Sequence, residues 1–247
     1  MSGQKTRSVA GAKADARQHP DADPAARHYA GGVVDDIMVV GVGGQGVIVA
    51  AAIIADAALL HGGLEVKLSE TRGMSQRGGS VSSHIRIGTT VIAPSISPGE
   101  VDYLLAFEQA EGLRAAPSVV AGGAAIVNTQ QIVPPLASST EYSYPYDAIE
   151  RLRECSRQRR EGEGGARTHP GGGCLTVING NALAAQVGDV KVAGVVLVGA
   201  LSAHLPFAVE TWEKAIARNV PASWLEMNRA AFAMGRRMVA IDRGEQT

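Results

Sequence analysis

Short runs of apolar residues recur along the chain and predict β-strands. A strand buried on both faces of a parallel sheet is continuously apolar, whereas a strand with one polar face alternates. Residues 81–87 alternate, with Ser82, His84 and Arg86 in the polar phase, which predicts a half-buried strand. Continuous runs predict buried strands at residues 37–40, 101–107, 124–128 and 175–178, and a further short strand at 91–93.

Segments with helical spacing of apolar residues lie between and after these strands. Residues 47–60 are rich in alanine, a strong helix former. Residues 192–203 are apolar but too few to span a bilayer, and Gly194 and Gly199 allow close approach, which predicts a core or interface helix. This alternation predicts an α/β fold, a Rossmann-like three-layer sheet domain with a helical C-terminal tail. Further helices are predicted at residues 108–116, 148–160, 181–186, 193–204, 208–218 and 222–238.

Changes in composition divide the chain into three segments. Residues 1–34 mix glycine, alanine, proline and charged residues without a period, and they lack the apolar stretch of a signal peptide. They are predicted to be a disordered tail. Residues 35–190 form the predicted Rossmann-like unit, with a flexible Gly/Arg/Glu insertion near 157–173. Residues 191–247 are predicted to be a helical region of the same domain.

A glycine turn at residues 41–46 follows the first predicted strand and precedes the helix at 47–60. The free N–H groups and the positive dipole end at such a helix start favour an anion. Gly41, Gly43 and Gly46 also satisfy the dinucleotide-binding spacing, with Glu70 where a ribose-binding acid would lie. Residues 88–90 are predicted to be a turn that joins the strands at 81–87 and 91–93 into a hairpin. A hairpin after Glu70 departs from the dinucleotide-binding fold, which has a crossover helix there, and indicates an antiparallel portion in the sheet.

A second glycine-rich stretch, residues 69–80, carries two arginines at the carboxyl end of the next predicted strand. Guanidinium groups bind phosphate through paired hydrogen bonds, so an ordered functional loop is favoured over a surface pair of arginines. No residue is assigned a catalytic or metal-binding role. The candidate cofactor-binding residues are Gly41, Gly43, Gly44, Gln45, Gly46, Glu70, Arg72, Ser75, Gln76, Arg77 and Gly78.

Composition and isolated polar residues exclude several classes of function. A net charge of −1 argues against nucleic acid as the main partner. The two cysteines cannot supply the four thiolates of a ferredoxin-type cluster, and a disulfide between them is not indicated. His84 is interpreted as a hydrogen-bonded structural histidine, and no nucleophile elbow surrounds Ser75 or Ser80. The tyrosines of residues 142–146 are expected to pack on the domain or on a partner more readily than to line an aromatic substrate pocket.

The two glycine-rich strings resemble a known family. Together with residues 83–88 and 101–108, they are similar to the gamma domain, or beta subunit, of 2-oxoacid:ferredoxin oxidoreductases, in particular the small subunit of the indolepyruvate type. The resemblance extends from about residue 36 to residue 237. The strings around Gln45 and at residues 76–80 are its most distinctive parts.

The resemblance implies a cytoplasmic, multi-subunit enzyme. Such a complex oxidatively decarboxylates an aryl 2-oxoacid with coenzyme A, giving CO2, an acyl-CoA thioester and reduced ferredoxin. Thiamine diphosphate and iron–sulfur clusters are expected on a large partner subunit, and the loop with Arg72 and Arg77 is expected to contact coenzyme A phosphates. Two alternatives remain open: a free-standing nucleotide-dependent dehydrogenase, and a non-catalytic scaffold subunit of the same complex.

Overall fold

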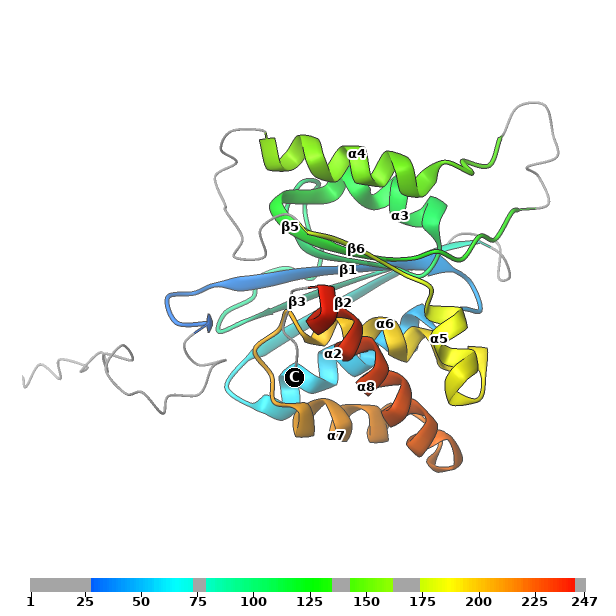
Figure 1. Cartoon of the computed structure of the whole chain (residues 1–247). Helices are drawn as coiled ribbons and strands as arrows, with labels where there is room; N and C mark the ends of the chain where they lie inside the picture. Colours follow the sequence, from blue (N-terminus) through cyan, green and yellow to red (C-terminus); the bar gives the residue numbers. More distant parts are fainter. Residues whose placement is uncertain (1–27, 73–78, 135–142, 162–173, 243–247) are drawn as a thin grey trace, which may run out of the picture.

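A computed structural model describes residues 28–72, 79–134, 143–161 and 174–242. Six strands and the helices around them follow one another in the described chain (Figure 1). The strands are β1 (Val34–Val42), β2 (Glu65–Arg72), β3 (Ser80–Gly88), β4 (Val101–Ala106), β5 (Val119–Asn128) and β6 (Leu175–Ile178). The helices are α2 (Val47–His61), α3 (Gln109–Ala115), α4 (Ala148–Glu161), α5 (Gly180–Val187), α6 (Ala193–Ser202), α7 (Val209–Asn219) and α8 (Leu225–Asp242).

The strands of the described residues form one mixed sheet in the order β2-β3-β1-β4-β5-β6. β1, β4, β5 and β6 are parallel, whereas β3 pairs antiparallel with both β1 and β2. The predicted antiparallel portion of the sheet is therefore confirmed, but β3 pairs with β2 and β1 and not with residues 91–93, as the predicted hairpin required. β1, predicted as a parallel strand, has a parallel neighbour on one side only.

Helices cover both faces of the sheet, which confirms the three-layer α/β prediction. α3 and α4 lie on one face, and α2 with α5 to α8 lies on the other (Figure 1). The alternation of apolar side chains along each strand supplies a core on each face: Ile37 and Val39 of β1 pack toward α2, while Met38 and Val40 pack toward α3 and α4. β4 is buried along its whole length, as its continuous apolar sequence predicts.

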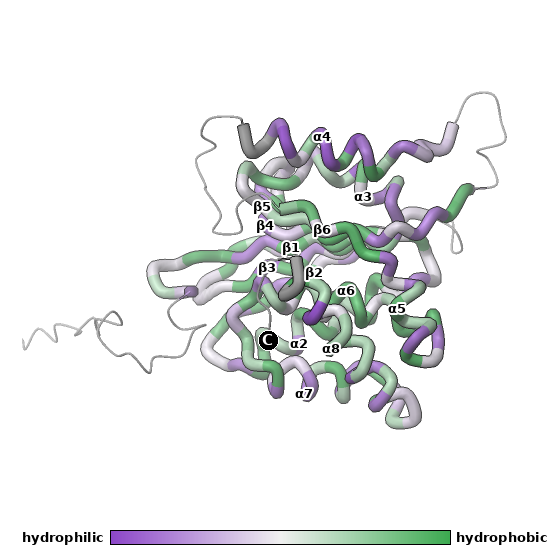
Figure 2. The backbone as a smooth tube through the Cα atoms, viewed as in Figure 1, coloured by the Kyte–Doolittle hydropathy of each residue, from purple (hydrophilic) through white to green (hydrophobic). Residues whose placement is uncertain are grey.

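α6 is a core helix. All ten of its residues are buried. Figure 2 shows that α6 is mainly hydrophobic, whereas α4, on the other face of the sheet, is mainly hydrophilic. α6 and α8 pack at backbone contact because each helix places a glycine against the backbone of the other. A Cβ on Gly199 would lie 2.2 Å from the Phe232 carbonyl oxygen, and one on Gly235 would lie 1.8 Å from that of Val196. No helix in the described ranges has the length and apolar character needed to cross a bilayer.

Two predictions about local structure are wrong. Residues 91–93 form no strand: the Val91 N–H is donated to the Glu65 carboxylate, and Arg86 binds the Ala93 carbonyl oxygen, so side chains satisfy the backbone where a ladder would. His28 and Tyr29, near the end of the predicted tail, pack on the domain, whereas residues 30–33 are exposed. Tyr29 is 1% exposed and donates a 2.6 Å hydrogen bond to the Asp35 carboxylate.

No disulfide joins the two cysteines, because both thiols are free. Cys155 lies on α4 and Cys174 directly precedes β6, and both residues line one small hollow beside β5.

Candidate functional site

The carboxyl edge of the parallel strands contains the point where the chain reverses its winding direction. α2 leaves β1 on one face of the sheet, and α3 leaves the neighbouring strand β4 on the other (Figure 1). Ligands of open α/β sheets bind in the crevice that such a reversal creates. The glycine turn lies directly in this crevice, between the end of β1 and the start of α2.

The glycine turn combines close packing with an open helix start. Gly41 is buried, and a Cβ there would lie 2.8 Å from Phe107 Cβ, so only glycine fits. Gly44 has a φ of 102°, and a Cβ at this position would meet nothing within 4 Å. Gly46 is the N-cap residue of α2, and no side chain accepts a hydrogen bond from the helix start there. The first N–H groups of α2 have no helical acceptor and point to the crevice, which makes the turn a candidate anion site.

Not every N–H group of the turn is available to a ligand. The Gly43 N–H is donated to the Gly79 carbonyl oxygen over 2.9 Å, and the Gln45 N–H is donated to the Val42 carbonyl oxygen over 3.1 Å. The donors left for an anion are therefore those of the helix start. The contact with Gly79 also brings the described end of the second glycine-rich stretch against the turn.

Gln45 braces the turn through both ends of its carboxamide. Its Oε1 accepts the Val42 N–H over 2.7 Å, and its Nε2 donates to the Phe107 carbonyl oxygen over 3.0 Å and to Gln130 Oε1 over 2.8 Å. This side chain ties the end of β1 to the ends of β4 and β5. The structure thus gives Gln45, a predicted ligand contact, an internal role as well.

A cavity of about 570 Å³ opens at the carboxyl edge, and we call it the edge cavity. Carboxamide side chains and one lysine face it from segments far apart in the sequence. Asn128 Nδ2 donates to the Asn181 Oδ1 over 2.9 Å and thereby links the end of β5 to the start of α5. The residues that line the cavity are Gly43, Gly44, Gln45, Gly46, Phe107, Asn128, Gln130, Ile132, Asn181, Val190, Lys191, Ala193 and Gly194.

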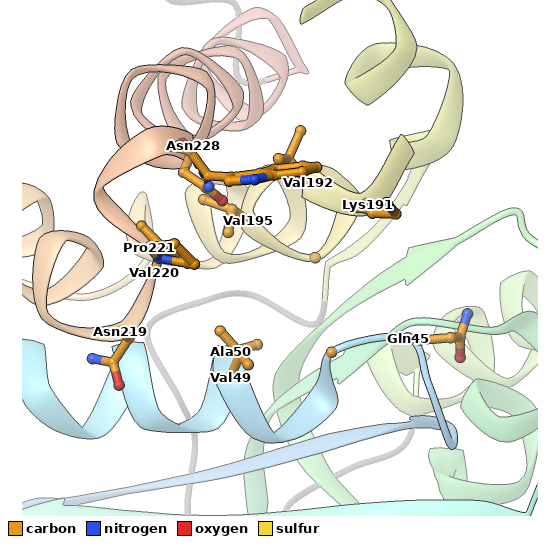
Figure 3. A pocket seen from close by; sticks show the side chains of 13 residues that line it. Gln45, Val49, Ala50, Lys191, Val192, Val195, Asn219, Val220, Pro221 and Asn228 are labelled. Carbon is orange, nitrogen blue, oxygen red and sulfur yellow. Dashed lines mark hydrogen bonds between the residues drawn. The ribbon is translucent and has the colours of Figure 1, made fainter. Parts of the chain in front are cut away.

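A second hollow of about 250 Å³, the side cavity, lies between α2, α6 and the start of α8. Figure 3 shows Val49 and Ala50 of α2 facing Val195 and Pro221 across it, while Gln45 points away. Its lining is mainly apolar. The two cavities share Gln45, Gly46, Lys191 and Gly194, so they meet at the start of α2.

Glu70 and Arg72 lie at the same edge of the sheet but on the outermost strand. Arg72 pairs with Val81, and Val81 pairs with Gly41. The backbones of Arg72 and Gly41 are therefore two strand spacings, roughly 10 Å, apart. Glu70 is exposed. In a dinucleotide-binding fold the acidic residue lies on the strand next to the first, and here β3 occupies that place. The geometry therefore disfavours the dehydrogenase alternative.

Four predicted site residues fall outside the described part of the chain. These are Ser75, Gln76, Arg77 and Gly78, and the side chain of Arg72 lies outside it as well. Gly41, Gly43, Gly44, Gln45 and Gly46 are brought together at the carboxyl edge as the sequence predicts.

Sequence reasoning missed the polar residues that line the far side of the edge cavity. Asn128, Gln130 and Asn181 follow strands that were predicted, but carboxamides at strand ends are common and carry no distinctive spacing. Lys191 lies between Asp189, which caps a short 3-10 helix at residues 190–192, and the apolar helix α6. Its ammonium group lies 5.4 Å from the centre of the Trp224 ring, an approach that only the folded chain creates.

The remaining titratable candidates have structural partners. His84 Nδ1 accepts the Ile96 N–H over 3.2 Å, and burial lowers the pKa of His84, so the ring is neutral. The hydrogen bond to Asp35 raises the pKa of His28. Tyr144 is buried and donates to the Glu108 carboxylate, as the packing interpretation of this tyrosine predicts. Within the described residues, no group of three or more His, Cys, Asp or Glu side chains could hold a metal ion.

Comparison with known proteins finds a matching protein family and similar sequences. The model of the pyruvate ferredoxin/flavodoxin oxidoreductase family matches residues 36–238. The chain is 37% identical to the indolepyruvate oxidoreductase subunit IorB of Archaeoglobus fulgidus over 81% of this chain and 92% of that protein. It is 32% identical to the subunit of the same name from Thermococcus kodakarensis, over 81% and 93% of the two chains.

A solved structure shows the same fold. The gamma subunit of a keto/oxoacid ferredoxin oxidoreductase from Geobacter sulfurreducens aligns with a TM-score of 0.59 and 26% identity, over 84% of this chain and 99% of that chain.

Proposed function

The chain belongs to the pyruvate ferredoxin/flavodoxin oxidoreductase family, and from this premise we propose that it is the small subunit of a cytoplasmic 2-oxoacid:ferredoxin oxidoreductase acting on indolepyruvate or a related arylpyruvate. The observation that carries the proposal is similarity along nearly the whole length of two indolepyruvate oxidoreductase subunits. The glycine turn at the sheet's winding reversal supports it, because a ligand-binding role needs such a crevice.

The cofactors of the reaction belong, in this proposal, to a large partner subunit. When bound there, thiamine diphosphate stabilises the carbanion left by loss of CO2, and iron–sulfur clusters pass the electrons to ferredoxin. This chain has only two cysteines, whereas a ferredoxin-type cluster needs four thiolates, so its thiols do not fit a cluster. Its contribution is to complete the coenzyme A site.

The glycine turn is the proposed contact for phosphate groups of coenzyme A. Gly44 fits this role because the position of a Cβ there is open space beside the edge cavity. The N–H groups at the start of α2 and the ammonium group of Lys191 supply donors and charge. Arg72 and Arg77, from the second glycine-rich stretch, are proposed to add charge-assisted hydrogen bonds.

Reconstitution tests the subunit assignment. The isolated chain, given indolepyruvate, thiamine diphosphate, coenzyme A and an artificial electron acceptor, is expected to show no turnover. Addition of the large subunit should restore turnover and produce a stable complex on gel filtration. Turnover by the chain alone would contradict the proposal, and full turnover by the large subunit without this chain would show that the chain does not complete the site.

Replacing Arg77 by alanine tests the coenzyme contact. A charge-assisted hydrogen bond contributes about 1.5–3 kcal/mol, so the KM for coenzyme A should rise roughly tenfold or more while thiamine diphosphate content stays constant. Arg153→Ala, on the exposed outer surface of α4, is the matched control. An Arg77→Ala complex that stays assembled with an unchanged KM would exclude the phosphate role, and loss of assembly would assign Arg77 to the subunit interface.

A further inference from the structure

Two buried carboxylates stand at the start of α3, beside the glycine turn. Glu108 is 1% exposed and Glu111 is 9% exposed. Burial of a carboxylate is unfavourable unless hydrogen bonds compensate for the lost water. Each carboxylate has such partners, and the partners belong to segments on either side of the turn.

The first connection runs from Glu108 to Gln45. Glu108 Oε1 accepts the Ile132 N–H over 3.2 Å and also accepts the Tyr144 hydroxyl. Two residues earlier, the Gln130 carbonyl oxygen accepts the Gln109 N–H over 3.1 Å, and Gln130 Oε1 accepts the Gln45 side-chain amide over 2.8 Å. Glu108 therefore fixes the segment whose glutamine holds Gln45 in the turn.

The second connection runs from Glu111 to Gly43. Glu111 Oε2 accepts the Ser80 hydroxyl over 2.7 Å, and the neighbouring Gly79 carbonyl oxygen accepts the Gly43 N–H over 2.9 Å. Glu108 Oε2 in turn accepts the Glu111 N–H over 2.8 Å, so the two carboxylates share one helix start. The turn is thus held from the β3 side and from the β5 side.

The turn needs this external support because most of it is glycine. Glycine has the greatest backbone freedom of all residues, so a glycine turn does not fix the direction of its own N–H groups. An anion site binds tightly when its donors are already oriented. We infer that Glu108 and Glu111 are positioning residues that hold the glycine turn in the shape that binds the phosphate groups of coenzyme A. This inference rests on the proposed function, and it assigns the shape of the site to residues outside it.

Kinetics of the assembled complex test the inference. Ser80→Ala and Glu111→Ala each remove the same connection, so each should raise the KM for coenzyme A roughly two- to tenfold, with kcat within about a factor of two. The double variant should be no worse than the more affected single variant. Ser80→Ala combined with Gln130→Ala breaks both connections, and the two increases in KM should multiply. Ser82→Ala, on the same strand as Ser80, is the matched control and should leave KM unchanged.

Gly44→Val separates failure of the inference from failure of the proposed function. If Gly44→Val raises the KM for coenzyme A but Ser80→Ala and Gln130→Ala leave it unchanged, the positioning role is overturned and the phosphate site stands. If Gly44→Val also leaves KM unchanged in an assembled complex, the phosphate site itself is excluded. A lower melting temperature of the Ser80→Ala chain with an unchanged KM would assign a purely structural role and overturn the inference. Glu111→Ala repeats the test if Ser80→Ala fails to assemble.

Discussion

Replacing Gly41 by alanine tests whether close packing fixes the glycine turn. The added Cβ would lie 2.8 Å from each of three atoms: Gln45 Oε1, Phe107 Cβ and Val47 Cγ2. Such a distance is too short for any real Cβ contact. Gly41 does not have a positive φ, so the obstacle is space and not backbone conformation.

The size of the effect follows from which neighbours can move. Phe107 and Val47 are buried at 2% and 3% exposure, so overpacking against them costs about 1–3 kcal/mol. The Gln45 side chain can turn away, but it then loses its bonds to the Val42 N–H and the Phe107 carbonyl oxygen, at about 0.5–1.5 kcal/mol each. We expect Gly41→Ala to lower the free energy of unfolding by about 2–5 kcal/mol, a large part of the stability of a typical domain.

Urea unfolding followed by the fluorescence of the buried Trp212 measures this loss. Gly44→Ala is the matched control because its Cβ enters open space, and the left-handed backbone alone costs it about 1–2 kcal/mol. A Gly41→Ala chain that is as stable as Gly44→Ala, with the same denaturant slope, would refute the packing argument.

Two further predictions concern buried ionisable groups. Arg86→Met removes the partner of Asp36, whose side chain is fully buried, and should destabilise the chain by about 3–5 kcal/mol in urea unfolding, with partial recovery in Arg86→Met/Asp36→Asn. His84, whose pKa is lowered by burial, contributes stability that is present above its unfolded pKa and lost as the pH falls through the folded value. His28, whose pKa is raised by its hydrogen bond to Asp35, contributes stability present below the unfolded pKa and lost as the pH rises through the folded value. The melting temperature of His84→Gln should therefore fall less steeply than that of the unmodified chain as the pH is lowered. The melting temperature of His28→Gln should fall less steeply as the pH is raised. Unchanged slopes would contradict both assignments.

Local patterns predicted most elements because each depends on contacts within a few residues. The glycine turn between β1 and α2 follows from glycine content beside an alanine-rich helix, and strand β3 follows from the alternation at residues 81–87. The wrong strand at residues 91–93 has the same apolar character as a real strand. Its backbone is satisfied by Arg86 and Glu65, and such side-chain contacts across the fold leave no trace in a local pattern.

The site was only partly predictable because its parts meet through the strand order. The glycine turn was evident in one continuous string. Gln130 and Asn181 come from the ends of β5 and β6, and Lys191 comes from the turn before α6, so no spacing along the chain connects them. The place of β3 between β1 and β2 is also a property of the sheet and not of any one segment.

That strand order determines which side of the glycine turn can hold a ligand. On the β3 side, the Gly43 N–H is already bound to Gly79, and Glu70 lies a further strand away and is exposed. No acidic side chain on an adjacent strand is available there to bind a ribose, as a dinucleotide-binding fold requires. On the β4 side, the edge cavity continues past the turn to Gln130 and Lys191. The edge cavity therefore gives a ligand whose phosphate binds at the start of α2 a path across the ends of β4 and β5, and a coenzyme with a long chain attached to its phosphates has the shape for that path.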